Sequence, residues 1–215
     1  MSVSEPILLE TSVRHVHLSK EHLKVLFGNS EDVLHSKRAL SQPGQFACYE
    51  KVDVVGPKRT LSGLTIVGPA RSQTQVELSI SDARAVGLDP PVRLSGDLEG
   101  SAPCKIIGPC GEIELKEGVI IMQRHIHMTP ADAEHFGRKN NELVSIRVES
   151  PTRSLTFDGV IIRVSVNAGL AIHIDTDESN AAGGTATTAV IVDAHRDKRM
   201  PPRNTISARR DNLLF

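Results

Sequence analysis

Two copies of a His-x-His triplet are the residues of this chain that point most directly to chemistry. The first copy is Arg14-His15-Val16-His17-Leu18-Ser19, the second is Arg124-His125-Ile126-His127-Met128-Thr129, and each follows an apolar run. Side chains alternate across a β-strand, so a His-x-His triplet on a strand places both imidazoles on one face. Two imidazoles on one face form half of a site for zinc or another borderline transition metal.

A third candidate ligand lies on a later predicted strand of each copy. It is Glu77 in Gln75-Val76-Glu77-Leu78-Ser79 and His173 in Ala171-Ile172-His173-Ile174-Asp175. Three protein ligands with an open fourth position are typical of catalytic zinc. Taken singly, each triplet would be two ordinary histidines and Glu77 a solvent-exposed charge, but the matched contexts favour metal binding. The two candidate ligand sets are His15, His17 and Glu77, and His125, His127 and His173.

Three arginines stand close to these candidate ligands. Arg71 follows the Gly68-Pro69 turn and precedes the strand that carries Glu77. A planar guanidinium holds phosphate through two parallel hydrogen bonds, so we expect Arg71 to bind substrate. Arg14 and Arg124 precede the two triplets, and either an anion contact or a structural ion pair is compatible with their position.

The elements that must position these residues are mostly β-strands. Short apolar segments bounded by Gly and Pro favour a barrel or a sandwich. Ser19 and Thr129 are predicted N-caps of short helices that stop at Gly28 and Gly137. A second pair of short helices is expected over residues 81–87 and 177–183, each after a ligand-bearing strand. We interpret His22 and His135 as helix-surface residues.

Composition sets the class of protein. The 215 residues suffice for one large domain or two small ones, and the net charge of −1, with one Tyr and no Trp, gives no support for nucleic-acid binding. We find no membrane span and no signal peptide, and the odd cysteine count favours reduced thiols, so we expect a cytoplasmic protein with no membrane partner.

Residues 29–49 are expected to form a lid or an inserted hairpin, and residues 195–215 a solvated tail.

No common nucleophilic or nucleotide-binding motif is present. The chain has no Walker loop, no dinucleotide-binding glycine pattern and no Gly-x-Ser-x-Gly elbow, and we find no convincing Ser/His/Asp or Cys/His arrangement. We therefore expect any chemistry to depend on a metal and an external nucleophile.

The combined motifs resemble the phosphate propanoyltransferase family, the zinc-dependent phosphotransacylases of propanediol-utilisation microcompartments. The resemblance spans about residues 6 to 193. It is carried by these segments: Val13-Arg14-His15-Val16-His17-Leu18-Ser19; Gly68-Pro69-Ala70-Arg71-Ser72-Gln73-Thr74-Gln75-Val76-Glu77-Leu78-Ser79; Gln123-Arg124-His125-Ile126-His127-Met128; and Ala171-Ile172-His173-Ile174-Asp175-Thr176-Asp177-Glu178.

The resemblance implies a mainly β fold with two β-barrel domains related by an internal repeat and capped by short helices. The first barrel would comprise residues 14–117, with a lid near 29–49; the second would comprise residues 118–194 and, by strand exchange, residues 5–13. It also implies two zinc ions per chain. His15, His17 and Glu77 would hold one, which the coenzyme A (CoA) sulfur can complete. His125, His127 and His173 would hold the other, and Arg71 matches the phosphate-contacting arginine.

The resemblance finally implies an activity, the interconversion of acyl-CoA plus phosphate with acyl phosphate plus CoA, by direct attack of phosphate on a propanoyl or other short acyl group. Two alternatives stay open at this stage: a metal-dependent thioester hydrolase and a non-catalytic, metal-stabilised barrel protein. A homo-oligomer is compatible with the sequence. Many family members carry an N-terminal encapsulation extension, and because only residues 1–13 precede Arg14, we do not expect microcompartment targeting by that route.

Overall fold

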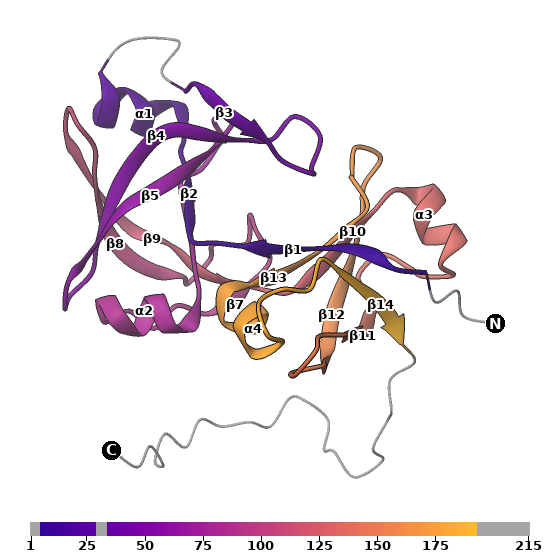
Figure 1. Ribbon diagram of the computed structural model, residues 1–215. Coiled ribbons are helices and arrows are strands. Elements are labelled where there is room, and N and C mark those ends of the chain that lie inside the picture. Colours follow the sequence, from indigo (N-terminus) through magenta and orange to yellow (C-terminus); the bar gives the residue numbers. More distant parts are fainter. Residues whose placement is uncertain (1–4, 29–33, 193–215) are drawn as a thin grey trace, which may run out of the picture.

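The structure is a computed structural model that describes residues 5–28 and 34–192 (Figure 1). The predicted tail over residues 195–215 lies outside the described residues, as does the start of the predicted lid. The elements in chain order are β1 (Ile7–Ser12), β2 (His15–His17), α1 (Lys20–Phe27), β3 (Ser36–Ala39), β4 (Phe46–Val55), β5 (Thr60–Gly68), β6 (Gln75–Leu78), α2 (Ile80–Val86), β7 (Val92–Arg93), β8 (Ala102–Ile107), β9 (Glu112–Met122), β10 (His125–Met128), α3 (Pro130–His135), β11 (Leu143–Val148), β12 (Leu155–Val164), β13 (Ala171–Asp175), α4 (Thr176–Ala181) and β14 (Thr188–Val192).

The strands form two six-stranded barrels, which confirms the predicted fold class. In the first barrel β4, β5, β2, β6 and β9 pair in that order, and β8 closes the ring between β9 and β4. The second barrel closes in the order β1-β13-β10-β12-β11-β14. The repeat is visible in the pairing: each triplet strand runs parallel to one neighbour and antiparallel to the strand that carries the third candidate ligand.

The strand that precedes each triplet belongs to the opposite barrel. β1 runs directly into β2 of the first barrel, yet it pairs with β13 and β14 of the second (Figure 1). The sequence predicts residues 118–194 in the second barrel, whereas Val119 and Ile121 at the end of β9 pair with β6 and are buried in the first core. The apolar run before the second triplet is therefore buried in the first barrel, and the two barrels exchange strands reciprocally.

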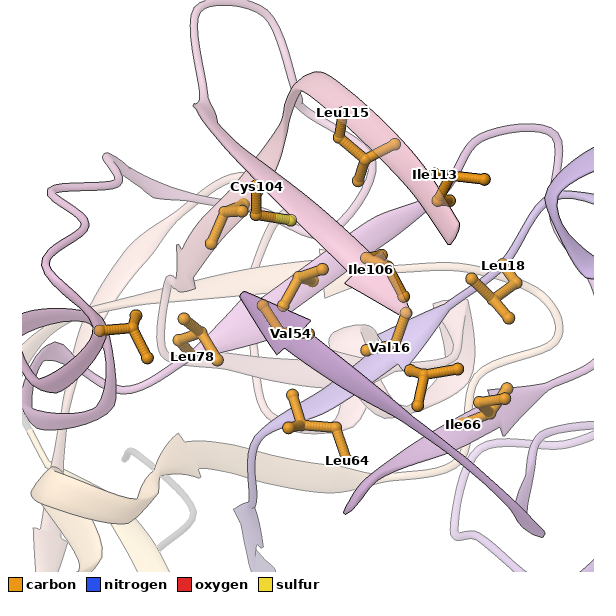
Figure 2. Close-up of a cluster of buried hydrophobic side chains, with 14 of the residues drawn as sticks. Val16, Leu18, Val54, Leu64, Ile66, Leu78, Cys104, Ile106, Ile113 and Leu115 are labelled. Atoms are coloured by element: carbon orange, nitrogen blue, oxygen red, sulfur yellow. The ribbon is translucent and has the colours of Figure 1, made fainter. Parts of the chain in front are cut away.

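Each barrel has its own hydrophobic core. Val16 is fully buried in the first core, beside Leu64 and Ile106 (Figure 2), and Ile126 is fully buried in the second. Because side chains alternate along a strand, burying the central residue of each triplet inside its barrel turns both histidines to the outer face. The two pairs of histidines thus lie on the outer faces of their barrels.

Short helices follow the ligand-bearing strands. Ser19 and Thr129 are the N-caps of α1 and α3, and Gly28 ends α1, as predicted. The Ser19 hydroxyl accepts a hydrogen bond from the His22 amide at 3.2 Å, and Thr129 forms a capping box with Asp132. The C-cap of α3 is Phe136, one residue before the predicted stop at Gly137. α2 and α4 begin one residue earlier than expected, at Ile80 and Thr176, since the residue before each one is the cap. Each cap thus lies two residues after a candidate ligand.

Candidate metal centre and active site

A cavity of about 1100 Å³ lies between the two barrels and contains all the predicted site residues. Both barrels contribute to its lining. The sequence analysis singled out these lining residues with metal-binding or charged side chains: Arg14, His15, His17, Arg71, Glu77, His125, His127 and His173. The tertiary structure therefore brings both candidate ligand sets and Arg71 to one cavity.

The first ligand group lies on β2 and β6, where His15 is directly opposite Glu77 in the strand register. The Nε2 atoms of His15 and His17 are 3.1 Å apart. The Glu77 carboxylate approaches them, with Oε2 3.5 Å from His15 Nε2 and Oε1 3.9 Å from His17 Nε2. One ligand atom from each residue converges on a common point, as a three-ligand metal site requires.

The second ligand group repeats this arrangement on β10 and β13, with His125 opposite His173. The Nε2 atoms of His125 and His127 are 3.0 Å apart. The ring of His173 lies 5.1 Å from that of His125 and 4.9 Å from that of His127, centroid to centroid. In each group the ligand atoms all lie within 4.8 Å of one another.

Backbone carbonyls orient three of these imidazoles. The Nδ1 atoms of His15, His17 and His125 lie 2.8, 3.0 and 2.7 Å from the carbonyl oxygens of Val13, Val67 and Gln123. A carbonyl oxygen only accepts, so each Nδ1 carries the proton and the Nε2 lone pair faces the cavity. This is the outer-shell arrangement by which metal-ligating histidines are held in one tautomer.

Burial favours the neutral form of three of the candidate ligand imidazoles. It lowers the pKa of His17 and of His125 well below the usual range, with neighbouring imidazoles adding to the effect. Burial, followed by the charges of His173 and Arg163, lowers the pKa of His127 to about 3. Neutral imidazoles bind a metal without first losing a proton, so the donor set fits a cation.

Arg71 is held at the edge of the first ligand group by a small polar network. Its Nη1 donates to the Ser95 hydroxyl at 2.9 Å, and the Gln75 amide donates to the same hydroxyl at 2.8 Å and to Glu77 Oε1 at 2.5 Å. The Arg71 amide donates to the Leu18 carbonyl at 2.9 Å, which attaches this loop to the segment after β2. One network thus orients both the arginine and the carboxylate ligand.

Glu10, Gln42, Ser95 and Arg163 are among the cavity residues that were not identified from the sequence. Glu10 on β1 lies opposite His173, its Oε2 3.0 Å from His173 Nε2, and it accepts a hydrogen bond from the Ser41 hydroxyl. The alternation of β1, with Leu9 buried and Glu10 outward, is a signal for its direction. Which barrel Glu10 faces depends on strand exchange, and no local sequence pattern specifies that exchange.

The hairpin between β3 and β4 crosses from the first barrel to the second. The Gln42 amide donates to the Gly169 carbonyl at 2.9 Å and accepts from the Gly169 amide at 3.2 Å. A Cβ atom at residue 169 would lie 2.4 Å from the Ser41 carbonyl oxygen, so only glycine permits this approach. The hairpin residues Ser41, Gln42 and Gln45 line the cavity.

The remaining predicted residues have structural partners. Arg14 pairs with Asp82 of α2 at 2.8 Å and Arg124 with Glu178 of α4 at 2.5 Å, so both form ion pairs, and Arg14 also lines the cavity. His22 is not a simple surface residue, because it is half-buried and its Nδ1 lies 2.7 Å from the Thr74 hydroxyl. His135 is exposed, as predicted. The free cysteines Cys48 and Cys104 are buried and Cys110 is exposed.

The fold and the site define a class: a protein of two strand-exchanged β-barrels with paired three-residue candidate metal sites facing one cavity. A family model described as phosphate propanoyltransferase matches residues 8–185. The chain is 50% identical over 176 residues to the phosphate propanoyltransferase of Thermotoga maritima, covering 82% of this chain and 83% of that one. It is 46% identical over 178 residues to that of Salmonella typhimurium, covering 83% and 84%. The chain belongs to the phosphate propanoyltransferase family.

One negative finding concerns membranes. Within residues 5–28 and 34–192, none of the helices combines the length and the hydrophobicity needed to cross a bilayer.

Proposed function

We propose that this protein is a phosphate acyltransferase that interconverts acyl-CoA plus phosphate with acyl phosphate plus CoA. Family membership supports this reaction, and the names of the relatives favour propanoyl as the acyl group. The observation that carries the proposal is the meeting of two ligand groups and Arg71 in one cavity. Two candidate metal sites and an arginine that can bind an anion suit a reaction between a thioester and a phosphate.

The proposed cofactor is zinc, with two ions per chain. His15, His17 and Glu77 would hold one ion, and His125, His127 and His173 the other. Tetrahedral zinc places ligand nitrogens about 3.3 Å apart, close to the 3.1 and 3.0 Å between the paired Nε2 atoms. When bound, zinc supplies a Lewis acid for the thioester carbonyl and a soft partner for the thiolate of CoA.

The reaction balances without a covalent enzyme intermediate. An oxygen of HPO₄²⁻ forms a bond to the thioester carbonyl carbon, the C–S bond breaks, and the phosphate proton passes to the departing thiolate. No cysteine lines the cavity within the described residues. Burial raises the pKa of Cys48 to about 11 and that of Cys104 to about 12, so neither supplies a thiolate at neutral pH. These facts support direct attack by phosphate.

The residues of the chain would act mainly by positioning. Phosphate near neutral pH is already a competent nucleophile, so holding it against the thioester supplies most of what the reaction needs. We assign this role to Arg71, which Ser95 and the Leu18 carbonyl hold in place. We also propose that the Gln42 hairpin is the lid, since it lines the cavity and bonds to the opposite barrel.

A thiol-release assay tests the proposal. Purified protein of measured metal content is incubated with acetyl-, propanoyl- and butanoyl-CoA while phosphate is varied. We expect thiol release to depend on phosphate, to produce acyl phosphate in equal amount, and to stop after chelation and return with zinc. Release that ignores phosphate would favour a thioester hydrolase instead. Unfolding on chelation, with no binding of acyl-CoA beforehand, would favour a non-catalytic barrel protein.

A further inference from the structure

Arg14, Arg38 and Arg71 line the cavity, and a further arginine, Arg163, lines it from the second barrel. Arg163 lies on β12, in register with His127 on the parallel strand β10, and it lines the cavity together with Arg71. Its side chain is half-buried. The outer face that carries the histidines of the second group therefore also carries a guanidinium.

The positive charge of Arg163 has no close partner in the described part of the chain. The guanidinium makes no hydrogen bond or ion pair there, and the Arg71 guanidinium donates only to the neutral hydroxyl of Ser95. The carboxylate that acts on both arginines is Glu77, which also belongs to the first ligand group. Two guanidiniums thus share one carboxylate that already has another role.

Burial makes this excess charge costly. It lowers the pKa of Arg71 and of Arg163 from their usual values, and the charge of Arg163 lowers the pKa of Arg71 further. A partly buried charge without a partner is unfavourable, and an arrangement that places two like charges at one cavity is stabilised when an anion enters. A multiply charged oxyanion is the ligand that this charge pattern fits.

We propose that Arg163 is a second phosphate-binding residue, which acts with Arg71 to hold the phosphoryl group between the two barrels. This inference rests on the proposed function and adds a residue to its phosphate site. Each guanidinium presents parallel N–H groups that match phosphate oxygens, and two of them match the charge of the dianion. Because Arg71 belongs to the first barrel and Arg163 to the second, the phosphate would lie between the two ligand groups.

The phosphate groups of CoA offer the same chemistry as free phosphate, so the experiment separates the two. The steady-state KM is measured for phosphate and for acyl-CoA in wild type, Arg163→Gln and Arg163→Lys. Calorimetric titration with inorganic phosphate alone gives the equilibrium affinity. Arg147→Gln is the matched control, because Arg147 lies on β11 outside the cavity lining and pairs with Glu149 at 2.7 Å. Thermal unfolding and metal content are recorded for every variant.

Loss of charge-assisted hydrogen bonds predicts that Arg163→Gln raises the KM for phosphate about ten- to a hundredfold. The KM for acyl-CoA should stay within about twofold, and the affinity for inorganic phosphate should fall in parallel. Arg163→Lys, which keeps the charge but loses the planar fork, should lie between wild type and Arg163→Gln. Arg147→Gln should match wild type.

Two results would overturn the inference: an unchanged phosphate KM in folded, metal-loaded Arg163→Gln, or a rise confined to acyl-CoA, which would place the CoA phosphates on Arg163. If Arg163→Gln does not fold, the KM values of Arg163→Lys for phosphate and for acyl-CoA distinguish the same outcomes. Failure of the proposed function is a separate result, because it would appear as phosphate-independent thiol release by the wild-type protein.

Discussion

Lowering the pH should destabilise the metal-free protein through the buried imidazoles of the second ligand group. The pKa of His127 is lowered from 6.5 to about 3 by burial and by the charges of His173 and Arg163. Since the folded-state pKa lies below the unfolded-state value, the unfolded chain takes up the proton first as the pH falls. The stability from neutral His127 is fully present above pH 6.5 and is lost between pH 6.5 and 3.

The size of the effect follows from linkage. Each pH unit below the unfolded-state pKa costs about 1.4 kcal/mol per group, so His127 accounts for a loss of about 2 kcal/mol between pH 7.5 and 5. Asp175 opposes it: burial raises its pKa to about 6, so its contribution becomes more favourable over the same interval. A comparison between wild type and His127→Gln cancels the contribution of Asp175.

The assay is urea unfolding of chelator-treated protein at several values between pH 7.5 and 5. We expect the free energy of unfolding to fall by about 2 kcal/mol more in wild type than in His127→Gln. Equal losses in the two proteins would show that His127 is not held neutral in the folded state. The argument that these imidazoles are neutral and can bind a metal without first losing a proton would then fail.

Three further outcomes follow from the site. His125→Ala should abolish phosphate-dependent thiol release while circular dichroism stays that of the wild type, and a purified variant at near wild-type rate would refute the metal assignment. Arg71→Ala should raise the KM for phosphate about tenfold or more and that for acyl-CoA less, whereas equal effects would contradict its role. Gly169→Ala should lower the free energy of unfolding by about 1–3 kcal/mol, because its Cβ would meet the Ser41 carbonyl oxygen, and an unchanged denaturation midpoint would count against the hairpin contact.

Strand exchange connects the two halves of the site through shared strands, a connection that two independent barrels would lack. β1 carries Glu10 into the second barrel and continues directly into β2, which carries His15 and His17. The end of β9 packs in the first core and continues into β10. Each ligand strand is thus tied to both barrels, so the two ligand groups cannot separate without unpairing a strand.

Local patterns in the sequence were sufficient to select the candidate ligands and to predict the elements beside them. Alternation on a strand places His15 with His17 and His125 with His127 on common faces, and this depends only on the period of two. Ser19 and Thr129 begin helices because a side-chain oxygen satisfies a free backbone N–H group. Comparison of the two repeats then selects Glu77 and His173, since equivalent positions occupy equivalent strands.

Tertiary structure alone decided which residues face one another across the cavity. Glu10 contacts His173 only because β1 pairs with a strand far along the chain, and Arg163 meets Arg71 only because two barrel faces pack together. Strand partners and barrel packing depend on long-range register, and nothing local in an apolar strand specifies which sheet edge it joins. An apolar run such as residues 118–122 could be buried in either barrel, so only the tertiary structure decides which barrel it joins.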